Sequence, residues 1–140
     1  MNSVVHFEMG YFDRERAKAF YAKAFGWELN QMGPEMGNYV VATTGASDPV
    51  SGRPTAPGYI NGGLYQKTDH PSSHAPSIVV AVEDIREAMQ RLQVAGGTIM
   101  SGMNPDGTHT MEPTEIPGVG FWISAQDTEG NRISLLQPKT

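Results

Sequence analysis

Apolar and polar positions follow a strand period and then a helix period, starting at the first residues of the chain. Residues 3–9 are rich in β-branched and aromatic side chains and predict a strand. Apolar residues then recur at helical spacing over 13–25, with Asp13 as the expected N-cap and Gly26 as the expected end. The apolar stripe of this helix is Ala17, Phe20, Tyr21, Ala24 and Phe25. It predicts packing of the helix against a sheet.

The rest of the first half predicts strands and one long loop. The strands are expected at 27–30, 38–43 and 60–66. Between the last two, residues 44–57 are rich in Gly, Ser, Pro, Asp and Thr and are a candidate lid or rim. Gly62 and Gly63 lie inside the last strand, where glycines mark a bulge or the close approach of another group.

The second half repeats the pattern after a linker at 67–75. Asp84 is the expected N-cap of a helix at 85–95, and Gly96 and Gly97 end it. The stripe of this helix is Ile85, Ala88, Met89 and Leu92. The strands are expected at 77–82, 98–100, 118–125 and 133–137, with a second long loop at 101–117.

The two halves superpose at an offset of about 71 residues, so the pattern is an internal repeat. The offset carries Asp13 onto Asp84 and Gly26 onto Gly97. Two modules are therefore predicted, at 3–67 and 75–138, within a single domain of residues 1–140. The fold class is α+β, with two tandem βαβββ modules forming a curved mixed sheet. We expect eight main strands and two main helices.

Composition narrows the class of partners. The 140 residues carry a formal net charge of −5, and no cluster of Lys or Arg indicates nucleic acid. There is no cysteine, no apolar run of membrane-spanning length, and no P-loop or dinucleotide glycine motif. We therefore expect a cytoplasmic protein with neither a nucleic-acid nor a membrane partner.

Several segments resemble one family when they are taken in order. The opening reads His6-Phe7-Glu8, then Phe20-Tyr21, then Phe25-Gly26-Trp27, and the close reads 116–120 followed by 127–131. This series looks like the vicinal oxygen chelate superfamily, which includes glyoxalase I, extradiol dioxygenases and the bleomycin and fosfomycin resistance proteins. The resemblance spans His6 to Gln137. It implies a half-barrel around a small-molecule cavity, and a homodimer.

The resemblance also implies four metal-ligand positions. They fall on His6, Gly63, Ser77 and Ser134. Only His6 is a good ligand for a divalent metal, and a catalytic metal needs about three protein ligands. We therefore predict no cofactor and no metal site of the standard kind. A divalent ion (Zn, Ni, Fe or Mn) held by irregular ligands is the alternative.

Further candidates come from strand geometry. His6 and Glu8 point to the same face of a strand, as an acid/base pair or as structural groups. The ligand-binding set is His6, Glu8, Tyr39, Tyr65, Ser77, Trp122, Ser134 and Gln137, and the strand aromatics serve equally well as core. His109 and Glu112 either complete a ligand set with His6 and Glu8 or lie in solvent. His70 and His74 are expected to be exposed.

Three functions follow from these residues. The first is a glyoxalase/bleomycin-resistance-like protein that binds a small organic molecule without the standard metal. The second is an enzyme, a lyase or dioxygenase with irregular metal ligands or a metal-free enzyme using His6 and Glu8. The third is an interaction module with a filled barrel.

Overall fold

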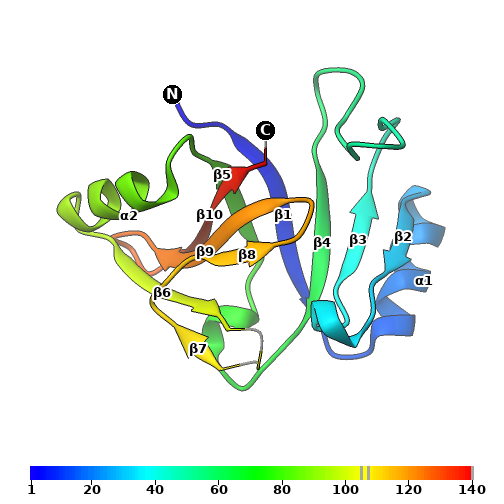
Figure 1. The fold of residues 1–140 in the computed structure, drawn as a ribbon. Coiled ribbons are helices and arrows are strands. Elements are labelled where there is room, and N and C mark those ends of the chain that lie inside the picture. Colours follow the sequence, from blue (N-terminus) through cyan, green and yellow to red (C-terminus); the bar gives the residue numbers. More distant parts are fainter. Residues whose placement is uncertain (105, 107, 140) are drawn as a thin grey trace. The chain divides into compact units, whose positions relative to one another are not determined.

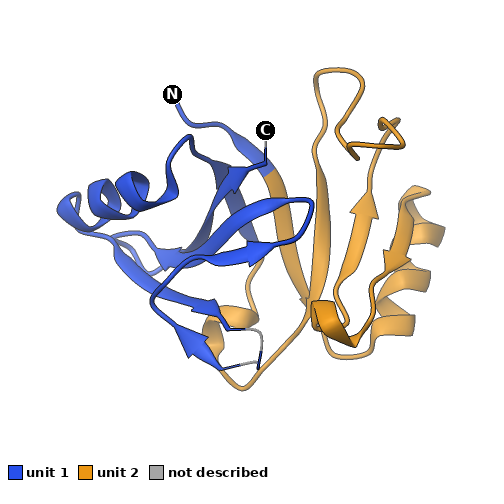
Figure 2. Ribbon diagram, viewed as in Figure 1, with its two compact units in different colours: residues 1–5, 77–140 blue, residues 6–76 orange. Residues whose placement is uncertain are grey.

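The computed structural model describes residues 1–104, 106 and 108–139, and the chain forms two compact units. Unit 1 contains residues 1–5 and 77–140, and unit 2 contains residues 6–76 (Figures 1 and 2). Each unit has a sheet with parallel and antiparallel neighbours and one long helix. The predicted α+β class is therefore confirmed.

Unit 2 contains a four-stranded sheet in the order β2-β3-β4-β1. Its elements are β1 (Val4–Tyr11, in this unit from His6), α1 (Arg14–Phe25), β2 (Glu28–Gln31), the 3-10 turn Pro34–Met36, β3 (Val40–Thr43), β4 (Asn61–Gln66) and the 3-10 turn Pro71–Ser73. Strands β1 and β4 are parallel, and the other neighbours are antiparallel.

Helix α1 begins and ends where the sequence predicts. Asp13 accepts a hydrogen bond from the Arg16 N–H at 3.0 Å, and Gly26 ends the helix with a φ of 71°. The predicted stripe is only partly right. Ala17 and Tyr21 pack against the core of Tyr11, Val40 and Leu64, but Phe20 and Phe25 are 57% and 62% exposed. One face of a helix this short covers only part of the sheet, and the two phenylalanines lie beyond it.

Unit 1 contains a sheet in the order β5-β10-β9-β6-β7, with β8 paired to β9. Its elements are β5 (Ser77–Ala81), α2 (Ile85–Val94), β6 (Thr98–Met103), β7 (His109–Thr110), β8 (Thr114–Ile116), β9 (Gly120–Gln126) and β10 (Arg132–Pro138). The single loop predicted at 101–117 is wrong, since it contains β7, β8 and the end of β6. Two- and three-residue strands are too short to show an alternating pattern.

The core of unit 1 lies between α2 and the sheet. Asp84 accepts hydrogen bonds from the Arg86 and Glu87 N–H groups, as expected of the N-cap. The predicted stripe is confirmed, because its four residues pack with the buried side chains of Ile99, Ile123, Ala125 and Leu135. Within the residues that the structure describes, no helix is long and apolar enough to cross a membrane.

Candidate functional site

Strand β1 divides its side chains between the two faces of the unit 2 sheet. Phe7 and Met9 point toward α1, where the Tyr21 hydroxyl lies 3.7 Å from the Met9 sulfur. His6 and Glu8 therefore point to the opposite face. The parallel register places His6 beside Asn61 and Glu8 beside Gly63. This face holds the candidate residues of unit 2.

The two adjacent glycines of β4 each lie beneath an aromatic side chain. A Cβ at Gly62 would lie 2.5 Å from the Phe7 ring, on the α1 face. A Cβ at Gly63 would overlap the Tyr39 hydroxyl, on the face of His6 and Glu8. The close approach predicted for these glycines is confirmed. Position 63 needs glycine because the phenol of Tyr39 fills the space a side chain would take.

Tyr39 is also joined to His6. The Tyr39 hydroxyl lies 3.0 Å from Nε2 of His6. Desolvation by burial lowers the pKa of His6 from 6.5 to about 4, so its imidazole is neutral at pH 7. The result is a neutral imidazole hydrogen-bonded to the Tyr39 side chain, which we call the His6–Tyr39 pair.

Two further candidates of unit 2 flank this pair. Glu8 is 7% exposed, so its carboxyl group is buried two residues from His6. Tyr65 donates its hydroxyl hydrogen bond to the Ser73 carbonyl at 2.9 Å, and the Ala75 carbonyl lies 3.5 Å away. Tyr65 thus fixes the segment after β4.

In unit 1, the sheet face away from α2 is polar. Ile133 and Leu135 of β10 point into the core with α2, so Arg132 and Ser134 point the other way. Ser134 is fully buried, and it lies opposite Ser124 of β9. Arg132 Nε donates a hydrogen bond to Ser124 Oγ at 3.2 Å.

Ser77 and Trp122 lie on this same face. Ser77 is 5% exposed, and its Oγ has no hydrogen-bond partner among the described residues. Trp122 precedes Ser124 by two residues on β9 and is half-buried. Gln137 differs from the other candidates, because its Oε1 accepts a hydrogen bond from the Ile85 N–H at 3.0 Å. Gln137 therefore caps the start of α2.

The long loop before β4 is held down by a buried asparagine. Asn61 accepts from the Thr44 N–H at 2.9 Å and donates from Nδ2 to Ser47 Oγ at 2.8 Å and to the Gly52 carbonyl at 3.1 Å. The Tyr59 hydroxyl adds a hydrogen bond to the Ala46 carbonyl. A loop fixed at this many points fits the rim better than the lid, the two roles that its composition left open.

The remaining histidines and Glu112 do not form a ligand set. Glu112 pairs with Arg86 of α2 at 2.5 Å, and His109 is exposed. His70 and His74 are exposed, as predicted. No group of three or more His, Cys, Asp or Glu in the described ranges is arranged to hold a metal ion.

The residues at the four family positions do not fit a catalytic metal. They supply one imidazole, no side chain at Gly63 and two hydroxyls, Ser77 and Ser134. The space above Gly63 is filled by the Tyr39 hydroxyl, which is a poor ligand while it keeps its proton. Among the four family positions, a divalent ion that replaced it would have only His6 as a strong donor.

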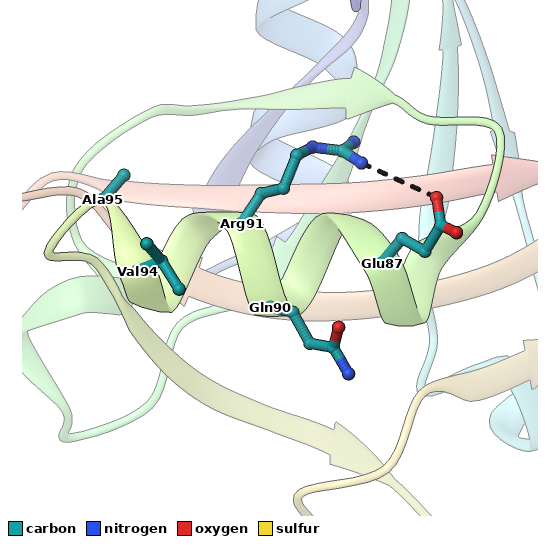
Figure 3. A pocket seen from close by; sticks show the side chains of 5 residues that line it. All are labelled: Glu87, Gln90, Arg91, Val94 and Ala95. Carbon is teal, nitrogen blue, oxygen red and sulfur yellow. Dashed lines mark ion pairs between the residues drawn. The ribbon is translucent and has the colours of Figure 1, made fainter.

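Two surface hollows lie away from these residues. One, of about 360 Å³, is on the α1 side of unit 2 and has Phe7, Trp27 and Tyr59 among its walls. The other lies along α2, beside the Glu87–Arg91 ion pair (Figure 3). All the residues that line this second hollow come from one helix, so it is an exposed helix surface.

Comparison with known proteins identifies the superfamily of the chain. The model of the Glyoxalase/Bleomycin resistance protein/Dioxygenase superfamily matches residues 3–135, and the chain belongs to this superfamily. The resemblance seen in the sequence is therefore confirmed. No curated protein matches the chain.

Solved structures share the fold at low sequence identity. A hypothetical protein, BH1468, from Bacillus halodurans C-125 aligns with a TM-score of 0.65 and 14% identity over 99% of this chain and 96% of its own. A superfamily member from Vibrio splendidus 12B01 gives 0.60 and 17% over 98% and 99%. Methylmalonyl-CoA epimerase from Mycobacterium tuberculosis gives 0.61 and 13% over 98% and 88%. At these identities the likeness concerns the fold alone.

Sequence reasoning missed two features of the candidate site. Tyr39 was expected to line the ligand cavity or the core. Its hydrogen bond to His6 was not expected, because it requires the space left by the missing side chain of Gly63. Ser124 and Arg132 were not singled out. The signal for them was the alternation of β9 and β10, in which polar residues interrupt two apolar strands at matching positions.

Proposed function

We propose that this protein binds a small organic molecule without the standard metal of its superfamily. The observation that carries the proposal is the His6–Tyr39 pair above Gly63. It places a neutral polar group at a position where metal-using relatives are expected to hold an ion. Binding then relies on hydrogen bonding and apolar contact rather than on a Lewis acid.

The chemistry of the pair indicates the kind of ligand group. A phenol hydroxyl both donates and accepts hydrogen bonds, which matches the hydroxyl or carbonyl group of an organic ligand. The His6 imidazole is uncharged at pH 7, because burial keeps its pKa near 4. An uncharged hydroxyl or carbonyl on an aromatic or aliphatic body is the matching ligand.

Ligand-observed NMR tests this directly. The probes are phenol, benzyl alcohol, benzaldehyde and acetophenone, each added to untagged protein in the presence of a chelator. We expect saturable binding of at least one probe, weakened about fivefold or more in Tyr39→Phe. Tyr59→Phe is the matched control, because the Tyr59 hydroxyl binds the Ala46 carbonyl within the loop. Equal affinity of wild type and Tyr39→Phe for every probe would show that the His6–Tyr39 pair takes no part in ligand binding.

A second candidate is metal-free proton transfer by Glu8 and His6. It is favoured by the burial of Glu8 at 7% exposure on the same strand face as His6. The measurement is exchange of an acidic C–H of a bound carbonyl compound in deuterated water. If the wild-type protein catalyses this exchange and Glu8→Gln binds the compound without catalysing it, the protein is an enzyme rather than a binding protein.

We also propose a homodimer. Phe12, Phe20 and Phe25 are 69%, 57% and 62% exposed, and large apolar side chains are commonly covered by a partner. Sedimentation equilibrium is expected to give twice the 15.2 kDa chain mass at micromolar concentration. A mass of one chain would contradict this. A cytoplasmic location stays a prediction.

A further inference from the structure

We infer that the hollow on the α1 side of unit 2 is a second ligand site, one that takes an uncharged aromatic ring. This α1-side hollow has a volume of about 360 Å³, within the range of small-molecule sites, and its aromatic walls are Phe7, Trp27 and Tyr59. The residues that line it all belong to unit 2. The site goes beyond the proposed function, because Phe7 points to the opposite face of the sheet from the neighbouring His6.

Two of the aromatic walls lie directly over glycines. A Cβ at Gly62 would come within 2.5 Å of the Phe7 ring, and a Cβ at Gly45 would come within 2.7 Å of the Tyr59 ring. The Tyr59 hydroxyl also donates a hydrogen bond to the Ala46 carbonyl. Both rings therefore pack against the backbone of unit 2, which fixes their positions.

The third aromatic wall is fixed by other rings. Trp27 is stacked on Tyr21 of α1, with 4.9 Å between the ring centroids and 7° between the ring planes. The centroids of Trp27 and Phe7 are 5.5 Å apart. Such ring pairs stabilise both partners beyond the area that they bury. The hollow is thus preformed, and little free energy is lost in ordering its walls when a ligand binds.

The hydroxyl groups of the walls are engaged within unit 2. Thr44 Oγ1 donates to the Ile60 carbonyl at 2.6 Å, and the Tyr59 hydroxyl donates to a loop carbonyl. The Met9 sulfur lies 3.7 Å from the Tyr21 hydroxyl. The surface left for a ligand is therefore mainly aromatic and aliphatic carbon.

The charge of the walls decides the class of ligand. None of the described residues that line the hollow is charged, and the aliphatic part of the wall is Met9, Ile60 and Pro76. A carboxylate or phosphate would lose part of its hydration there without meeting a counter-charge. A carbon ring avoids this loss and gains edge-to-face or offset contacts with aromatic side chains. A small ammonium ion is the competing class, because aromatic faces also attract cations.

Protein NMR with small probes tests the inference. Toluene and indole are added to untagged protein, with cyclohexane as the non-aromatic reference and tetramethylammonium as the cationic reference. Trp27 is one of two tryptophans, and its indole N–H signal is assigned with Trp27→Leu. We expect at least one aromatic probe to shift this signal saturably, to bind about threefold or more tightly than cyclohexane, and to bind more tightly than tetramethylammonium.

Two variants change the hollow in different ways. Ile60→Phe adds a ring where the ligand ring would lie and is expected to weaken the aromatic probe at least tenfold. Phe7→Leu removes one aromatic wall and is expected to weaken it about threefold or more. Phe121→Leu is the matched control, because Phe121 is a 40% exposed phenylalanine of unit 1, and its affinity should equal that of wild type. Denaturation of each variant shows that it is folded, and Phe7→Leu keeps the test decisive if Ile60→Phe does not fold.

Three results would overturn the inference: neither aromatic probe shifts the Trp27 signal saturably, cyclohexane or tetramethylammonium binds as tightly as the aromatic probe, or the folded hollow variants keep wild-type affinity. The hydroxyl and carbonyl probes of the His6–Tyr39 proposal are measured again in Ile60→Phe, so that binding at the two faces is separated. Tyr59→Phe keeps the ring that lines the hollow, so it still serves as the control for the Tyr39 hydroxyl. Either proposal can therefore fail while the other stands.

Discussion

The Tyr39 hydroxyl lies 3.0 Å from Nε2 of His6, in the space that a side chain at position 63 would occupy. Three positions distant in sequence are thus coupled. Gly63 leaves space because it has no side chain, the Tyr39 ring occupies that space, and His6 contacts the Tyr39 hydroxyl. The space beside Gly63 is thus occupied by a hydroxyl that is hydrogen-bonded to His6.

A prediction follows for the glycine. Gly63→Ala should force the Tyr39 ring to move and lower the free energy of unfolding by about 1 to 3 kcal/mol. The measurement is chemical denaturation. A double-mutant cycle with Tyr39→Ala is the control, since removal of the ring removes the clash. Gly63→Ala should then cost roughly 1 kcal/mol less in the Tyr39→Ala background, and strict additivity would show that the two residues do not interact.

The lowered pKa of His6 predicts a pH dependence of stability. In the unfolded chain His6 takes up its proton near pH 6.5, and in the folded protein only near pH 4. Between these values the unfolded state binds more protons, so the free energy of unfolding falls as the pH is lowered. Because His6 is partly exposed, we expect a loss of about 1 to 3 kcal/mol from this group.

His6→Gln isolates this effect from the titration of the carboxyl groups. Denaturation of both proteins at pH 7, 5.5 and 4.5 should show wild type losing stability relative to the variant on acidification. NMR of the imidazole should give the low pKa directly. A difference between the proteins that stays constant over this range would mean that His6 titrates normally.

The loop anchor gives another prediction. Asn61→Ala removes three hydrogen bonds to residues 44–52 and should lower the free energy of unfolding by about 2 to 3 kcal/mol. Amide exchange should rise across residues 44–59 above all. Asn131→Ala is the control, because Asn131 is exposed and its side chain donates to the carboxylate of Asp127, four residues earlier. Uniform exchange across the unit would contradict the role of Asn61 as a local anchor.

Strong local signals in the sequence predicted both helices and the eight longer strands. Asp13 and Asp84 cap helices because a side-chain oxygen meets free N–H groups within three residues, which is a local matter. The exposure of Phe20 and Phe25 depends on how much of α1 lies against the sheet. The spacing of apolar residues along one helix does not reveal the extent of that contact. Strands β7 and β8 were missed because two or three residues show no period.

The candidate site was predictable by position rather than by contact. The resemblance to the superfamily implied His6, Gly63, Ser77 and Ser134. The repeat offset supported this set, because it pairs His6 with Ser77 and Gly63 with Ser134. Which aromatic ring would cover Gly63 depended on the pairing of β3 with β4, and register is not fixed by one sequence. The caps and backbone contacts of Gln137 and Tyr65 likewise arise from tertiary packing.

Metal analysis tests the central claim, that the His6–Tyr39 pair stands in place of a metal site. Untagged protein is incubated with Zn, Ni, Fe or Mn, dialysed without chelator and analysed for metal, alongside His6→Ala. We predict that neither protein retains a stoichiometric amount of any of the four ions. One equivalent retained by wild type and lost in His6→Ala would contradict the claim and restore a metal centre at His6.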